Sequence, residues 1–164
     1  MVATRLIKIF FLERDLKVKE ELQRVLTKKG LNDINWFNKE EECLKQLEHK
    51  PDFIFQDKVE DNTGGYTLFY ESKKKVPHSK FIFVCPDKYK SFGEKGLEIG
   101  ADALYIVNPS TYENFASEVH QMVLNEKFKR FNQSVNIGML EFFAIIGFLL
   151  IIIISVVFLN PSIF

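Results

Sequence analysis

The sequence predicts an α/β fold, in which helices cover both faces of a mostly parallel sheet, followed by one membrane-spanning helix. Three observations predict this. Apolar runs of strand length alternate five times with segments of helical spacing up to about residue 127. Most of these runs are apolar almost throughout, as expected for strands that are buried on both sides. Finally, residues 142–159 carry no charged or amide side chain.

The strand-like runs are short and apolar. They are RLIKIFFL (5–12), INWF (34–37), DFIFQ (52–56), KFIFVC (80–85) and ALYIV (103–107). Between them, apolar residues recur at intervals of three and four, which is the spacing of one helix face. Such residues are Leu22, Val25 and Leu26 in the first segment, Cys43, Leu44 and Leu47 in the second, and Phe115, Val119, Met122 and Val123 in the last.

Composition excludes some classes of function. Lys+Arg and Asp+Glu each total 22, so charge gives no reason to expect a nucleic-acid partner. The three histidines are scattered and no CxxC pair occurs, so the sequence predicts no metal site. In a reducing cytoplasm, Cys43 and Cys85 are expected to be free thiols.

The run FFAIIGFLLIIIISVVFL (142–159) is apolar on every face, whereas the core helix of a soluble protein normally keeps a polar stripe. At about 1.5 Å per residue it spans roughly 27 Å, close to the ~30 Å core of a bilayer. Basic residues precede it in NEKFKRF and are absent from NPSIF after it. The positive-inside rule then predicts a single-pass protein of the inner (cytoplasmic) membrane, with its N-terminal part in the cytoplasm.

These patterns give the expected domain organisation. An α/β domain occupies residues 1–127, and residues 128–138 form either a juxtamembrane linker or an extension of the last helix. The membrane helix covers 139–160, and 161–164 form a short tail.

Several local motifs share one order and spacing. PDFIFQD (51–57) ends a buried strand with an acid, at the strand end where open α/β sheets place their chemistry. Gly65 follows eight residues later, NKEEECLKQL lies at 38–47, and LEIGADALYIVNPS lies at 97–110. Together they resemble the receiver domain of two-component response regulators over about residues 4–125. The resemblance implies a five-stranded, flavodoxin-like sheet of order 2-1-3-4-5, with Asp57 at the phosphoacceptor position.

In that family, two acids after the first strand hold Mg²⁺, which neutralises the phosphoryl charge. Here the chain has Glu13 and then Arg14, with Asp15 next. An arginine at this position either repels the metal or fills its place and faces Asp57. We expect Arg14 either to pair with Asp57 or to point to solvent.

The family's remaining groups are also altered. Cys85 stands where a Ser or Thr hydroxyl ends the fourth strand, and a thiol is a much weaker hydrogen-bond donor. Asn108 stands at the position of the lysine, while Tyr105 matches the aromatic switch position. The resemblance therefore implies a degenerate receiver in which Asp57 has lost most of the groups needed for phosphotransfer.

Three functions follow as hypotheses. The preferred one is a non-enzymatic, membrane-anchored pseudo-receiver without a cofactor, which docks a protein partner near Tyr89, Phe92, Tyr105 and Tyr112. The second is a receiver phosphorylated at Asp57, which would need Mg²⁺. The third is a structural subunit of an inner-membrane protein complex.

Overall fold

The computed structural model describes residues 6–57 and 65–159, with side chains as far as residue 150. The chain divides into two compact units. Leu6–Val123 form the α/β unit, and the second unit contains the chain from Leu124 onward.

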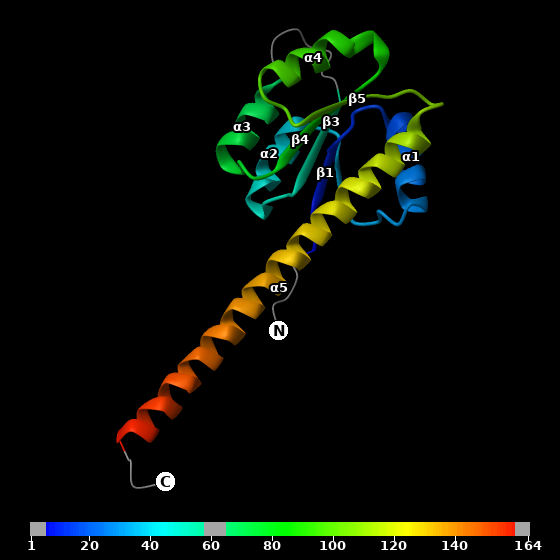
Figure 1. Cartoon of the computed structure of the whole chain (residues 1–164). Helices are drawn as coiled ribbons and strands as arrows, with labels where there is room; N and C mark the ends of the chain where they lie inside the picture. The colour runs from blue at the N-terminus through cyan, green and yellow to red at the C-terminus, as the bar shows by residue number, and fades with distance from the viewer. Residues whose placement is uncertain (1–5, 58–64, 160–164) are drawn as a thin grey trace. The chain divides into compact units, whose positions relative to one another are not determined.

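The α/β unit is built on a five-stranded sheet in which every neighbouring pair of strands is parallel. Its order is β2-β1-β3-β4-β5, so the expected order 2-1-3-4-5 is confirmed (Figure 1). The central β3 pairs with β1 on one side and β4 on the other, and this brings the carboxyl ends of these three strands together. The strands are β1 (Ile9–Leu12), β2 (Ile34–Phe37), β3 (Phe53–Asp57), β4 (Lys80–Cys85) and β5 (Ala103–Ile106).

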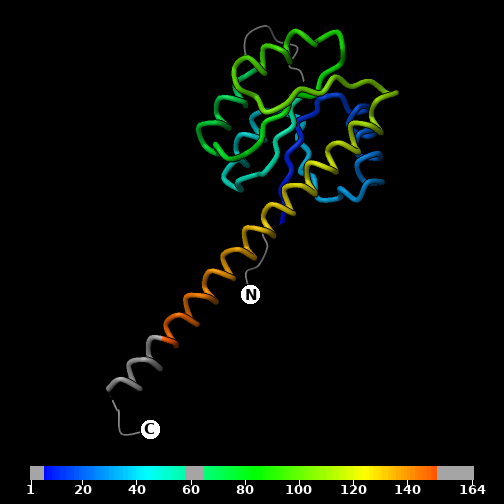
Figure 2. Tube along the Cα trace, viewed as in Figure 1, coloured from blue at the N-terminus to red at the C-terminus, as the bar shows by residue number. Residues whose placement is uncertain are grey.

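Helices follow the strands in alternation, and Figure 2 traces this path. The α-helices are α1 (Leu16–Lys28), α2 (Glu40–Gln46), α3 (Thr67–Lys75), α4 (Lys90–Glu98) and α5 (Tyr112–Leu159). Two short 3-10 helices, η1 (Leu47–His49) and η2 (Asp87–Tyr89), precede β3 and α4.

The sheet separates two hydrophobic cores, because successive strand residues point to opposite faces. On one face, Phe11 stacks against Phe55 with 5.2 Å between ring centroids, beneath α1 and the first turns of α5. On the other face, Phe10, Ile54 and Phe83 pack against α2, α3 and α4. Every residue of β1 is buried, which agrees with the fully apolar run in the sequence.

Helix α4 approaches the sheet closely at its glycines. A Cβ atom added at Gly96 would lie 2.4 Å from the ring of Phe83, and one at Gly93 would lie 2.2 Å from Leu104. The absence of these side chains lets α4 rest directly on β4 and β5.

In the second unit, the backbone is helical as far as Leu159, so residues 128–138 are part of α5. Many of its apolar side chains are exposed, Phe142, Phe143 and Phe148 among them. By length and composition, α5 is the one helix among the described residues that is suited to cross a membrane; an 18-residue window within Tyr112–Leu150 has a mean hydropathy of 1.6.

Candidate functional site: an acidic cleft at the carboxyl ends of the strands

A cleft of about 630 Å³ opens where β1, β3 and β4 end. Four of the predicted site residues line it, namely Glu13, Arg14, Asp15 and Asp57. The remaining lining residues are Val18, Val84, Pro86, Lys88, Tyr89, Val107 and Tyr112. The structure therefore brings the acidic residues together, as parallel strands that end at one edge require.

Glu13 is the most deeply placed of these acids, since only 2% of it is exposed. Its Oε1 accepts a hydrogen bond of 2.9 Å from the backbone N–H of Asp15. Burial first, and then the negative charge of Asp57, raises the pKa of Glu13 from 4.5 to about 8, although the backbone hydrogen bond from Asp15 lowers it. This shift favours the protonated form of Glu13 at neutral pH.

Asp15 serves as the N-cap of α1. Its Oδ1 accepts hydrogen bonds from the backbone N–H groups of Lys17 at 2.9 Å and Val18 at 3.3 Å. Asp15 is turned to its helix, and the raised pKa of Glu13 disfavours the ionised form of the carboxyl that Mg²⁺ prefers as a ligand. Across residues 6–57 and 65–159, no group of three or more acid, histidine or cysteine side chains has the arrangement of a metal site. The absence of a cofactor remains a prediction.

Arg14 has an acidic partner on another helix. Its guanidinium lies 3.7 Å from Oε2 of Glu40. Oε1 of Glu40 accepts a 2.7 Å hydrogen bond from the backbone N–H of Leu68 in the first turn of α3. Glu40 thus connects the end of β1 to the starts of α2 and α3. Arg14 is exposed, which agrees with one of the two expectations for it, and Glu40 lies within its reach.

Cys85 lies at the end of β4 but does not line the cleft. It is fully buried, and its thiol donates to the backbone carbonyl of Tyr89 at 3.6 Å. The preceding residue, Val84, pairs with Asp57 across the sheet and faces the cleft. Strand alternation therefore places an isopropyl group beside Asp57 and turns the thiol away.

Asn108, expected at the lysine position, organises the turn that leads to α5. Its Oδ1 accepts hydrogen bonds from the backbone N–H of Ser110 at 3.0 Å and from the Ser110 hydroxyl at 2.6 Å. Thr111 Oγ1 accepts from the Asn108 N–H at 2.9 Å. Asn108 is outside the lining of the cleft, so it supplies neither charge nor polarity beside Asp57.

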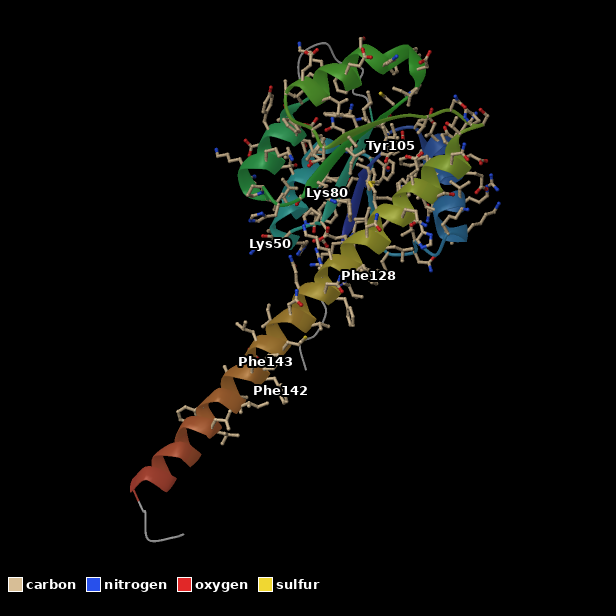
Figure 3. All side chains as sticks on the ribbon, in the orientation of Figure 1. Lys50, Lys80, Tyr105, Phe128, Phe142 and Phe143 are labelled. Carbon is tan, nitrogen blue, oxygen red and sulfur yellow. The ribbon has the colours of Figure 1, made fainter. Side chains whose placement is uncertain are left out.

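The four aromatics expected to form one partner face are separated in the structure. Tyr105 packs beneath α5, with its ring 5.3 Å from Phe115 (Figure 3). Tyr112 is buried, and Phe92 stacks on Tyr66 at 4.6 Å on the opposite side of the sheet from Tyr105. Tyr105 and Phe92 thus belong to opposite cores, and a partner surface near these four residues remains a prediction.

Two residues of this region were missed from the sequence. Lys88 lines the cleft and brings a cation to it, with its Nζ 4.7 Å from the ring centroid of Tyr89. The side-chain amide of Gln56 is buried and donates to the carbonyl of Gly65 at 2.8 Å, and its Oε1 finds no partner among the described residues. A signal existed for each: Lys88 follows a strand end, and Gln56 is a polar residue in an apolar strand.

The fold and the cleft define a receiver-type α/β domain. No family model matches the chain. The transcriptional regulatory protein CssR of Bacillus subtilis (strain 168) is 32% identical over 101 residues, which cover 62% of this chain and 44% of CssR. The chain thus spans less than half the length of this curated relative.

Solved receiver structures share the fold. The REC domain of AraT from Geobacillus stearothermophilus aligns with a TM-score of 0.60 at 16% identity, over 75% of this chain and 99% of that domain. A response regulator from Hahella chejuensis aligns with a TM-score of 0.63 at 14% identity, over 72% and 95%. The BeF3-activated DrrB receiver domain aligns with a TM-score of 0.55 at 20% identity, over 70% and 97%. At these identities the likeness establishes the fold.

Proposed function

We propose that this chain is a membrane-anchored receiver-type domain that serves signalling as a non-catalytic adaptor for a protein partner. The observation that carries the proposal is the burial of Glu13 in the cleft that Asp57 also lines, which raises the pKa of Glu13. A metal-dependent phosphoacceptor needs these carboxyls ionised around Mg²⁺. Here one of them is buried and protonated, and Arg14 and Asn108 are engaged elsewhere.

The competing function is a switch phosphorylated at Asp57, and Lys88 is the observation that favours it. A lysine that lines the same cleft can supply the positive charge that Asn108 does not. The two functions differ in one measurable property, which is the Mg²⁺-dependent binding of a phosphoryl group or its mimic at Asp57.

Titration of the full chain in detergent micelles with Mg²⁺ and beryllofluoride separates the two functions. Trp36 is the sole tryptophan and stacks on Phe11 of β1, at 4.6 Å between ring centroids, so its fluorescence reports on the strand that leads to Glu13. We expect no saturable change in the wild-type chain. A Mg²⁺-dependent, saturable change that disappears in Asp57→Asn would establish the phosphorylated switch and overturn the adaptor.

The partner surface is proposed at η2, beside the mouth of the cleft. No residue of η2 is buried, and it carries Lys88 next to Tyr89. Tyrosine is among the residues that most often anchor protein interfaces. A photo-crosslinking amino acid at Tyr89 is expected to capture a protein in native membranes. The same probe at Tyr70, an exposed tyrosine on α3, is the matched control.

Capture at Tyr70 but not at Tyr89 would move the partner surface to α3. Capture at neither position, under all growth conditions, would contradict the adaptor. A partner captured at constant stoichiometry in every condition would favour a structural subunit, whereas conditional capture would favour signalling.

The membrane anchor is supported by the length and apolar composition of α5 and by the basic residues at 127–130. Two measurements test it. The chain should stay with membranes after alkaline carbonate extraction, which releases peripheral proteins. An enzyme that is active only outside the cytoplasm should be active when fused after residue 164. An inactive fusion on an extraction-resistant chain would reverse the proposed topology.

A further inference from the structure

Helix α5 carries a narrow apolar stripe before its apolar segment begins. Between residues 124 and 136 the apolar side chains are Leu124, Phe128, Phe131 and Val135, and every other residue is polar or charged. Their spacing is four, three and four. A stripe confined to alternating steps of three and four is the seam of a coiled coil, narrower than the face a helix packs against a globular core.

These side chains are exposed. Leu124 is 40% exposed, Phe128 66%, Phe131 59% and Val135 42%. Figure 3 shows Phe128 projecting from the helix. The same spacing continues through Gly138 and Phe142 to Ile145 and Leu149, so that one stripe joins the polar and apolar parts of the second unit.

From this pattern we infer that a second copy of this chain covers the stripe, and that two α5 helices form a parallel homodimer. The charges of residues 124–136 favour this occupant. Glu126, Lys129 and Arg130 occupy outer positions of the heptad, where Arg130 Nε pairs with Glu126 Oε1 at 3.3 Å. Within residues 124–136, Lys127 is the one charged residue that flanks the seam, and in a parallel pair it faces Asn132 of the other copy. No like charges meet across the interface.

The parallel orientation rests on the proposed membrane anchor, because two chains inserted from the same side place equal heptads side by side.

The area is sufficient for a dimer. A phenylalanine buries about 150–250 Å², so Phe128, Phe131 and Phe142 alone hide roughly 300–450 Å² per chain at their present exposure. With the aliphatic residues of the stripe, this approaches the ~800 Å² per partner of a standard interface.

Cysteine cross-linking of the full chain in membranes tests the inference. Phe131→Cys and Val135→Cys place a thiol on the stripe, whereas Gln133→Cys and Asn136→Cys place it on the outer positions. The native cysteines are fully buried, so the wild-type chain is the background control. Under mild oxidation we expect roughly tenfold more covalent dimer from the two stripe positions, because a disulfide needs its Cα atoms within about 7 Å.

A second pair of variants measures the oligomeric state without oxidation. Phe131→Asp should convert the chain from dimer to monomer in detergent micelles, as measured by sedimentation. Gln133→Asp adds the same charge to the outer face and should leave the dimer intact.

Equal cross-linking at all four positions would overturn the inference, since it indicates random collision of helices surrounded by lipid. Cross-links to another protein, or none at all, would overturn it as well. If only the proposed membrane anchor is wrong, the result differs from failure of the homodimer. The chain then appears in the soluble fraction after carbonate extraction. In that case the same four variants, oxidised in solution, still decide whether the stripe of residues 124–135 pairs.

Discussion

Replacing Glu13 with glutamine should remove a pH dependence from the stability of the α/β unit. Burial and the neighbouring Asp57 raise the pKa of Glu13 from 4.5 to about 8 in the folded chain. Between these two pH values the folded state binds a proton that the unfolded state has released. Stability supplied by this group is therefore complete below about pH 4.5 and is lost as the pH rises through about 8.

The magnitude follows from the size of the shift. One proton bound only in the folded state lowers the free energy of unfolding by at most about 1.4 kcal/mol for each pH unit of increase. Over the whole interval the loss is on the order of a few kcal/mol, a large part of the 5–15 kcal/mol that is typical of a domain. Glu13→Gln cannot ionise, and its amide can still donate to Asp57 and accept from the backbone N–H of Asp15.

Urea unfolding of the full chain in micelles, followed by Trp36 fluorescence from pH 4.5 to 8.5, measures the effect. We expect Glu13→Gln to gain stability relative to the wild-type chain as the pH rises. Glu20→Gln, an exposed position on α1, is the matched control and should follow the wild-type curve. Parallel curves for wild type and Glu13→Gln would refute a buried, protonated Glu13, and with it the main support for the non-catalytic proposal.

Three further substitutions test the packing that positions the cleft. Gly96→Ala gains about 1 kcal/mol of helix propensity but drives a methyl group into the buried ring of Phe83, so we expect a net loss of up to about 2 kcal/mol in urea unfolding; a net gain would contradict the close approach of α4. Glu40→Ala removes the 2.7 Å bond to the N–H of Leu68 and should cost about 1.5–3 kcal/mol, whereas Glu40→Gln, which keeps the acceptor, should cost less. Asp15→Ala removes the N-cap of α1 and should lower the urea midpoint by the equivalent of about 1 kcal/mol; an unchanged midpoint would show that this cap contributes little.

The fold could be predicted from the sequence because its determinants are local. Five apolar runs separated by helical spacing require a sheet covered on both faces, and each run lies within a few residues of an observed strand. The strand order came from the resemblance of the motif around Asp57 to receiver domains, and the observed order agrees. The apolar run at 142–159 predicts a membrane helix in the same way, because its length and composition are local properties of the chain.

The chemistry of the cleft depends on contacts between residues that are far apart in the chain. Only the tertiary structure decided these contacts. Sequence position placed Arg14 near Asp57, but Glu40, at the start of another helix, lies within its reach. Strand alternation turned the thiol of Cys85 toward the Tyr89 carbonyl, away from the cleft.

The protonation of Glu13 was beyond the sequence for the same reason. A glutamate after a strand is ordinarily ionised, and its pKa rises only because the fold removes it from water and sets a second carboxylate beside it. The sequence by itself therefore determined which acids meet at the carboxyl ends of the strands. The tertiary structure determined their partners and charges, because desolvation and pairing depend on three-dimensional neighbours.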